Sequence, residues 1–263
     1  MCSMIVRFFA LLLLFPVIGA IASECQYGQK RLTKIDSDRY SEQIKDWLAN
    51  DTYGDDWACL MKERHLKRDS LKNCNPSEEE VQNFVPDKKI LIEGKIKYMG
   101  MIPQGYRYEV SPDGIEVRIA FKGELGNNED ALKATREKLK FASEIWTKNS
   151  PGGKLKFTFR QVGIDEDPHF TVKLQTKVKG TKFNSLWGFD DSKFIVAHEV
   201  GHMVGLDDEY SVARTIVWQV KNEVDTRMCN LRSLMCDYYS SSAILYPYVY
   251  YQIQRRAYCL MNK

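Results

Sequence analysis

The sequence predicts an α+β fold in which strands and helices lie in layers. Two kinds of pattern support this prediction. Beyond residue 88, apolar and polar residues alternate in several short runs, which is typical of strands with one buried face. Residues 128–148 instead place apolar residues at helical spacing, and a second helical pattern begins near Lys193.

The N-terminus predicts a secretory signal peptide over residues 1–22. Arg7 precedes an apolar run at residues 8–18, and small residues follow at 20–22, the spacing of a cleavage site. A membrane anchor is the alternative, but a proline and a glycine interrupt the short apolar stretch. We therefore expect a secreted or periplasmic protein without a stable membrane anchor.

Residues 23–88 form a polar segment with helical patterns at 37–49 and 55–72 and a glutamate-rich helix start at 76–80. Two interpretations are open for this N-terminal segment. It is either a small helical subdomain stapled by disulfides or a propeptide that covers an active site. We expect residues 89–263 to form the larger domain that follows it.

The cysteines of an exported chain are expected to form disulfides. Three of the six that follow the signal peptide precede residue 75 and three follow residue 228, so full pairing requires at least one bridge between the two groups. Within the second group, we expect Cys259 to pair with Cys229 or Cys236. An alternative is that Cys25, Cys59 or Cys74 supplies a thiolate to a metal and holds an enzyme latent.

The predicted elements of the larger domain alternate between strands and helices. Strands are predicted at 89–98, 106–110 and 114–122, then the helix at 128–148, then strands at 154–162 and 169–175. Residues 243–261 predict a final helix with Pro247 in its first turn, and we expect its aromatic stripe to pack in the core.

Residues 198–210, HEVGHMVGLDDEY, carry the candidate chemistry. His198 and His202 are four apart, so both imidazoles leave one face of the helix and can bind one metal ion. Glu199 then lies near the metal without binding it, which suits a base. Gly205 can adopt a positive φ and end the helix. Asp208 follows at the place of a third ligand.

This pattern resembles the HExxHxxGxxH/D motif of the metzincin metalloproteases. Its aspartate ending is similar to snapalysin-type enzymes, and the DEY ending to bacterial IgA-peptidase-like sequences. The resemblance implies a metzincin-like catalytic domain, a twisted mixed sheet with a long helix and an active-site helix. It also implies that His198, His202 and Asp208 bind Zn²⁺, that Glu199 is the catalytic base, and that Met235 forms a Met-turn below the metal.

The implied function is that of a secreted zinc-dependent endopeptidase, which hydrolyses a polypeptide through a zinc-activated water with Glu199 as general base. We expect the substrate to pair with an edge strand from residues 180–188. Tyr238 is a candidate oxyanion stabiliser. Two neighbours of Asp208, namely Asp207 and Glu209, are acidic and could compete for the metal.

Other interpretations stay open. Glu223 could be a distant third ligand of a gluzincin-type peptidase. Two histidines and a carboxylate could instead hold iron. A secreted binding or adhesion protein with a structural zinc is the non-enzymatic alternative, although it needs no Glu199. The formal charge of +3 is too small to indicate a nucleic-acid partner.

Overall fold

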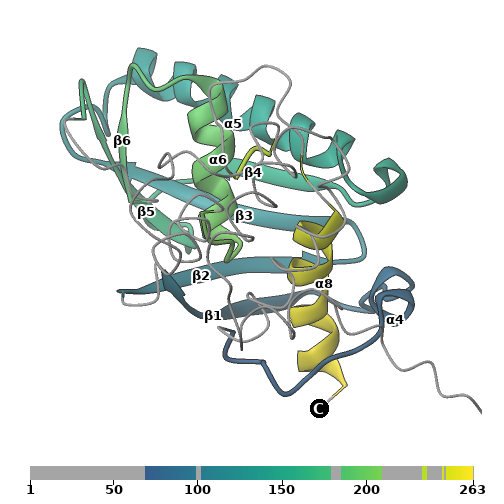
Figure 1. Ribbon diagram of the computed structural model, residues 1–263. Coiled ribbons are helices and arrows are strands. Elements are labelled where there is room, and N and C mark those ends of the chain that lie inside the picture. The colour runs from purple at the N-terminus through teal and green to yellow at the C-terminus, as the bar shows by residue number, and fades with distance from the viewer. Residues whose placement is uncertain are drawn as a thin grey trace, which may run out of the picture.

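The α+β class is confirmed by the computed structural model, which describes residues 69–98, 102–178, 185–208, 233–235, 245 and 247–262 (Figure 1). The predicted signal peptide and the helical pattern at 37–49 lie outside these residues. The helices are α4 (Glu78–Gln82), the 3₁₀ helix η2 (Pro151–Gly153), α5 (Glu129–Lys148), α6 (Lys193–Met203) and α8 (Pro247–Met261). The strands are β1 (Ile90–Tyr98), β2 (Ile102–Ser111), β3 (Gly114–Lys122), β4 (Phe157–Gln161), β5 (Phe170–Gln175) and β6 (Leu186–Gly188).

The six strands form one mixed sheet in the order β1-β2-β3-β5-β6, with β4 paired to β3. The pairs β1–β2 and β2–β3 are antiparallel, whereas β3 pairs in parallel with both β4 and β5, and β5 with β6. β2 pairs with residues 114–116 at the start of β3, and β5 pairs with residues 119–122 at its end. The sheet therefore changes from antiparallel to parallel along β3.

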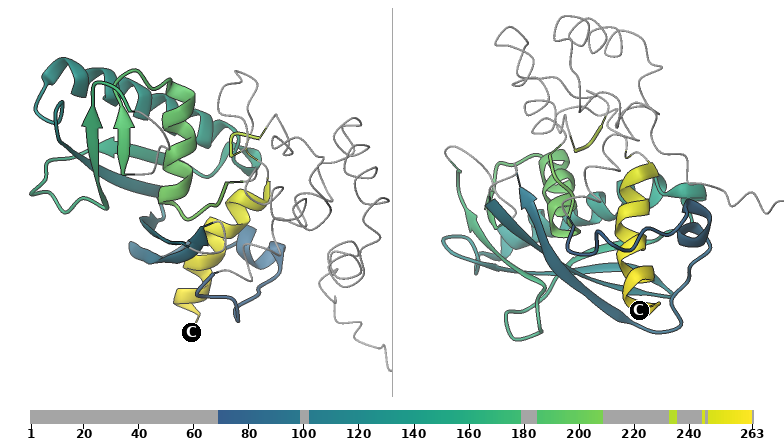
Figure 2. Two further views of the ribbon diagram at one scale, coloured as in Figure 1. Left: turned by 60° about the vertical axis from the view of Figure 1, so that its left-hand side comes forward. Right: turned by 60° about the horizontal axis from the view of Figure 1, so that its bottom comes forward.

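The apolar face of the sheet holds the core. Successive strand residues point to opposite faces, so Tyr108, Val117 and Phe159 are buried on one side, among the core residues, while the charged Glu109 and Arg118 lie on the other. α5, α6 and α8 lie over one face of the sheet (Figure 2). α6 packs beside α5 over this face, and its other neighbours include β2.

Side-chain caps define where the helices begin. Asn128 accepts the Ala131 N–H at 2.9 Å at the start of α5, and Ser77 forms a capping box with Glu80 at α4. Pro247 is the first residue of α8, as predicted. The tyrosines at 248, 250 and 251 are buried, which confirms for these three the prediction that the aromatic stripe packs in the core. Tyr258 is only half-buried, and its hydroxyl donates to Glu80 at 3.1 Å.

Residues 69–82 are joined to α8. A disulfide links Cys74 to Cys259, which confirms the predicted bridge between the two cysteine groups. The prediction that Cys259 pairs with Cys229 or Cys236 is wrong, because folding brings the end of α8 against the N-terminal segment (Figure 1). Cys74 is therefore not available as a thiolate ligand.

The helix predicted over residues 55–72 does not extend to its expected end. Residues 69–73 form turns, in which the Lys72 N–H donates to the Asp69 carbonyl at 3.2 Å. The Asp69 carboxylate accepts the Leu71 N–H at 3.0 Å, a local bond that competes with helical pairing. The earlier part of this pattern lies outside the described residues.

The polar face of the sheet carries a network of ion pairs centred on Glu109 and Arg118, whose carboxylate and guanidinium lie 2.7 Å apart. His169 is buried beside them, and its Nδ1 accepts the Arg118 backbone N–H at 3.2 Å. Burial and the positive charge of Arg118 lower the pKa of His169 to about 4. His169 is therefore a neutral structural residue.

This environment predicts a stability loss in acid. The pKa of His169 rises from about 4 in the folded chain to its usual 6.5 on unfolding, so its contribution is complete above pH 6.5 and is lost as the pH falls toward 4. Asn does not titrate and keeps an acceptor near the Nδ1 position. Between pH 7 and 4, we expect the free energy of unfolding of the original chain to fall by up to about 3 kcal/mol more than that of His169→Asn. Urea unfolding at both pH values measures this difference. A difference that does not change with pH would contradict this.

None of the helices in the described residues is both long and apolar enough to span a bilayer.

Candidate metal centre

α6 presents two histidines from a helix that is buried from Ile195 to Met203. Ser192 caps it by accepting the Ile195 N–H at 3.2 Å. His198 and His202 are both buried, at 2% and 5% exposure. The Trp146 indole of α5 donates to the Ala197 carbonyl at 2.9 Å and ties the two helices together. The imidazoles therefore project from a rigid support.

The turn after α6 carries the chain back toward the histidines. Gly205 has a φ of 84°, as predicted for a helix-ending glycine. Its N–H donates to the His202 carbonyl at 3.0 Å, and the Leu206 N–H donates to the Gly201 carbonyl at 3.0 Å. These two bonds form a Schellman motif. Two residues after Leu206, the chain places Asp208 opposite the histidines.

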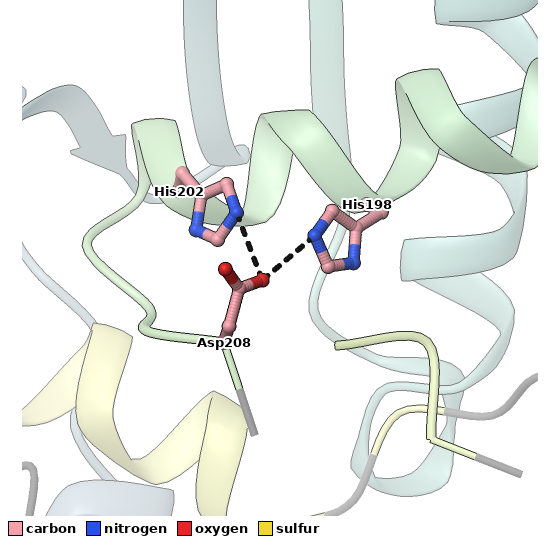
Figure 3. A group of neighbouring side chains, drawn as sticks. All are labelled: His198, His202 and Asp208. Carbon is pink, nitrogen blue, oxygen red and sulfur yellow. Dashed lines mark ion pairs between the residues drawn. The ribbon is translucent and has the colours of Figure 1, made fainter. Parts of the chain in front are cut away.

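The three predicted ligands meet at one point, as Figure 3 shows. Oδ1 of Asp208 lies 2.9 Å from Nε2 of His198 and 3.3 Å from Nε2 of His202. Asp208 is completely buried. Asp208 rather than its neighbour Asp207 therefore occupies the third position.

Backbone carbonyls fix which ring nitrogen faces this point. Nδ1 of His198 lies 2.8 Å from the Leu234 carbonyl, and Nδ1 of His202 lies 2.9 Å from the Leu206 carbonyl. A carbonyl only accepts hydrogen bonds, so each Nδ1 must carry a proton. In the neutral rings, both Nε2 atoms then direct lone pairs toward the Asp208 carboxylate. Three electron-rich atoms at this separation require a proton or a cation between them.

The pKa values of these groups describe the same requirement. Burial opposes a charged imidazole, but the Asp208 carboxylate overrides this effect and raises the pKa of His202 to about 10. Burial likewise opposes a charged carboxylate, yet His202 and His198 hold the pKa of Asp208 well below its usual range. A metal ion that binds here must displace the proton shared by these groups.

Glu199 is also buried, at 5% exposure, and it follows the first histidine of α6. Its Oε2 has no hydrogen-bond partner among the described residues. A buried carboxylate oxygen without a partner is costly, because it loses its hydration without compensation. Such an oxygen is suited to accept a hydrogen bond from a water or substrate group at the centre.

Met235 packs against α6 at Gly201. Its Cε would lie only 2.9 Å from a Cβ atom added to Gly201, and its Sδ would be closer still. Gly201 is therefore needed for this packing, a requirement that the sequence analysis missed although HEVGH contains it. The preceding Leu234 supplies the carbonyl that orients His198. The predicted Met-turn segment thus contacts the centre directly.

The donor set fits a small divalent cation. The ligand atoms of His198, His202 and Asp208 all lie within 4.8 Å of one another. Tetrahedral zinc with bonds of about 2.0 Å separates its ligands by roughly 3.3 Å, close to the separations seen here. Tyr238, Glu209 and Glu223 lie outside the described residues. The part of the chain that is described therefore defines an α+β protein with a candidate three-ligand metal centre.

Comparisons of the chain with protein-family models, with curated proteins and with solved structures found no match.

Proposed function

We propose that this chain is a secreted zinc-dependent endopeptidase of the metzincin type. The observation that carries the proposal is the meeting of two Nε2 lone pairs and the Asp208 carboxylate at one buried point, beside Glu199. Both Nδ1 atoms are engaged by carbonyls, so the ligand geometry is set before any ion binds. Such preorganisation supports a resident metal.

The reaction we propose is hydrolysis of a peptide bond. When bound, zinc would act as a Lewis acid toward the scissile carbonyl and lower the pKa of water at the site. The Glu199 carboxylate accepts a proton as water adds to the carbonyl carbon. It then delivers that proton to the leaving nitrogen as the C–N bond breaks, which yields a carboxylic acid and an amine.

The edge of the sheet at β6 offers a place for an extended substrate. β6 lies at the end of the described strand order. Bonds to β5 flank it at both ends, from the Lys173 N–H to the Ser185 carbonyl at 2.8 Å and from the Phe189 N–H to the Gln175 carbonyl at 2.7 Å. It also leads directly into α6. We propose that the substrate adds to this edge by main-chain pairing, so that its scissile bond approaches the centre.

Two further features support a metzincin-type arrangement. A glycine turn after the second histidine brings the third ligand back, and a methionine packs against the helix that carries both histidines. The position of Asp208 favours this residue over Glu223 as the third ligand, because a distant third ligand would leave the buried Asp208 carboxylate without a role. Glu199 favours hydrolysis over a structural zinc, which needs no base.

The test measures metal and activity together. The exported full chain and Glu199→Gln are purified, bound metal is determined by mass spectrometry, and cleavage of a denatured protein mixture is followed. We expect one zinc per chain in both proteins. Cleavage should be chelator-sensitive in the original chain and reduced at least about 100-fold in Glu199→Gln.

Two outcomes would overturn the proposal. Unchanged cleavage by Glu199→Gln would show that Glu199 is not the catalytic base. Bound zinc without cleavage, also in a chain cut before Asp69, would favour a binding or adhesion protein with a structural metal. The cut must precede Asp69 because this residue is fully buried against α8.

A further inference from the structure

Three charged side chains are buried together behind the metal centre. Asp69, Arg255 and Arg256 each have no exposed side-chain surface. Oδ2 of Asp69 accepts from Arg256 Nε at 2.6 Å and from Arg255 Nη2 at 2.9 Å. One carboxylate cannot balance two guanidinium groups, so the remaining positive charge requires other acceptors.

Arg256 finds these acceptors at the end of α6. Its Nη1 donates to the Val204 carbonyl at 2.6 Å, and its Nη2 donates to the Gly205 carbonyl at 2.8 Å. The carbonyl end of a helix carries partial negative charge and favours a cation. The Tyr106 ring stacks against the guanidinium, 4.1 Å from its centroid. Arg256 is therefore fixed on several sides.

The carbonyls that Arg256 binds belong to the turn that builds the metal centre. Leu206, the residue after Gly205, supplies the carbonyl that orients His202. Asp208 follows two residues later. A shift of this turn would therefore move a ligand and the orienting partner of another ligand at once.

We propose that Arg256 is a positioning residue for the metal centre. It holds the Gly205 turn, and with it Asp208 and the Leu206 carbonyl, at the geometry that binds the metal. Asp69 fixes Arg256 from the other side, so a residue far before the histidines takes part in building the site. The inference rests on the proposed metal binding and extends it to residues that do not touch the metal.

Arg255 provides a matched control. It is equally buried, lies on the same helix and binds the same Asp69 oxygen. Its other bonds, however, go to the carbonyls of Leu71 and Cys74 at 3.0 and 2.7 Å, away from the turn. A purely structural role for the buried charges would make the two arginines equivalent. A positioning role separates them.

The experiment compares Arg256→Lys with Arg255→Lys in the full chain. Lysine keeps the charge but loses the planar fork that reaches two carbonyls and Asp69. Cobalt(II) affinity is measured by competition with a chelator, its visible spectrum reports the ligand geometry, and unfolding of the metal-free proteins reports stability. We expect about 10- to 100-fold weaker binding and an altered spectrum for Arg256→Lys, but less than about threefold weaker binding for Arg255→Lys.

A double substitution tests whether Arg256 acts through Asp208. In an Asp208→Asn background, the effect of Arg256→Lys on cobalt affinity should be clearly smaller than in the original chain, because one of the two groups that Arg256 positions is gone and only the Leu206 carbonyl remains. Asp69→Asn serves as a second variant should Arg256→Lys not fold, and we expect it to weaken binding about three- to tenfold.

Several results would overturn the inference. The inference fails if both lysine variants bind cobalt with equal affinity. It also fails if Arg256→Lys has the same effect in the Asp208→Asn background as in the original chain, or if Asp69→Asn keeps full affinity. Failure of the unsubstituted chain to bind cobalt or zinc would overturn the proposed function as well. If the chain binds the metal and Arg256→Lys binds it with the same affinity, only the positioning role is overturned.

Discussion

Asp208→Asn should weaken zinc binding by more than about 100-fold. Substitution of a residue that merely orients a ligand already costs 10- to 100-fold, and Asp208 is proposed to bind the metal itself. Its Oδ1 faces both Nε2 atoms at 2.9 and 3.3 Å, and Asn removes the anionic charge at this point. The dissociation constant is measured by chelator competition at pH 7.

Asp207→Asn is the matched control for this change. Asp207 is also acidic and buried, but its Oδ1 accepts the Asp208 backbone N–H at 3.1 Å, a bond that an Asn side chain can retain. We therefore expect its zinc affinity to change by less than tenfold. A loss in Asp207→Asn that equals the loss in Asp208→Asn would refute the assignment of the third ligand.

Replacing Cys74 and Cys259 together by serine should lower the free energy of unfolding by about 2 to 5 kcal/mol. The disulfide joins residues 185 positions apart, and a bridge across so long a loop strongly restricts the unfolded chain. For a domain of this size, the loss corresponds to a decrease in Tm of roughly 5 to 15 °C.

Thermal unfolding of the oxidised chain, the reduced chain and the double variant measures this effect. In the double variant, reductant should have no further effect through this bridge. A double variant that unfolds at the same temperature as the oxidised chain would show that the buried contacts of α8, such as the Tyr108 hydroxyl bond to the Ile253 carbonyl at 2.9 Å, suffice without the bridge.

The local features of the centre could be predicted from the sequence because each depends on residues a few positions apart. Two histidines four apart share one helical face. A glycine after the helix predicts the turn that returns Asp208. These rules operate within one or two turns of chain, and the structure bears out each of them.

The remaining features depend on contacts between distant parts of the chain. Two arginines on a helix would be expected to face solvent. Only the fold shows that Arg255 and Arg256 are buried with the Asp69 carboxylate between them. The partner of Cys259 was missed for the same reason. The strand order could not be predicted either, because the alternation pattern shows which residues face the core but not which strands are neighbours.

The position of Arg256 in the chain also has a consequence for when the centre is completed. It follows Gly205 by 51 residues. At about 5 to 20 residues per second, a ribosome needs roughly 3 to 10 seconds to make this interval. During that time, a nascent chain holds both histidines and the aspartate without the guanidinium that secures their turn. We therefore expect a partly synthesised chain to bind a metal ion more weakly than the complete chain.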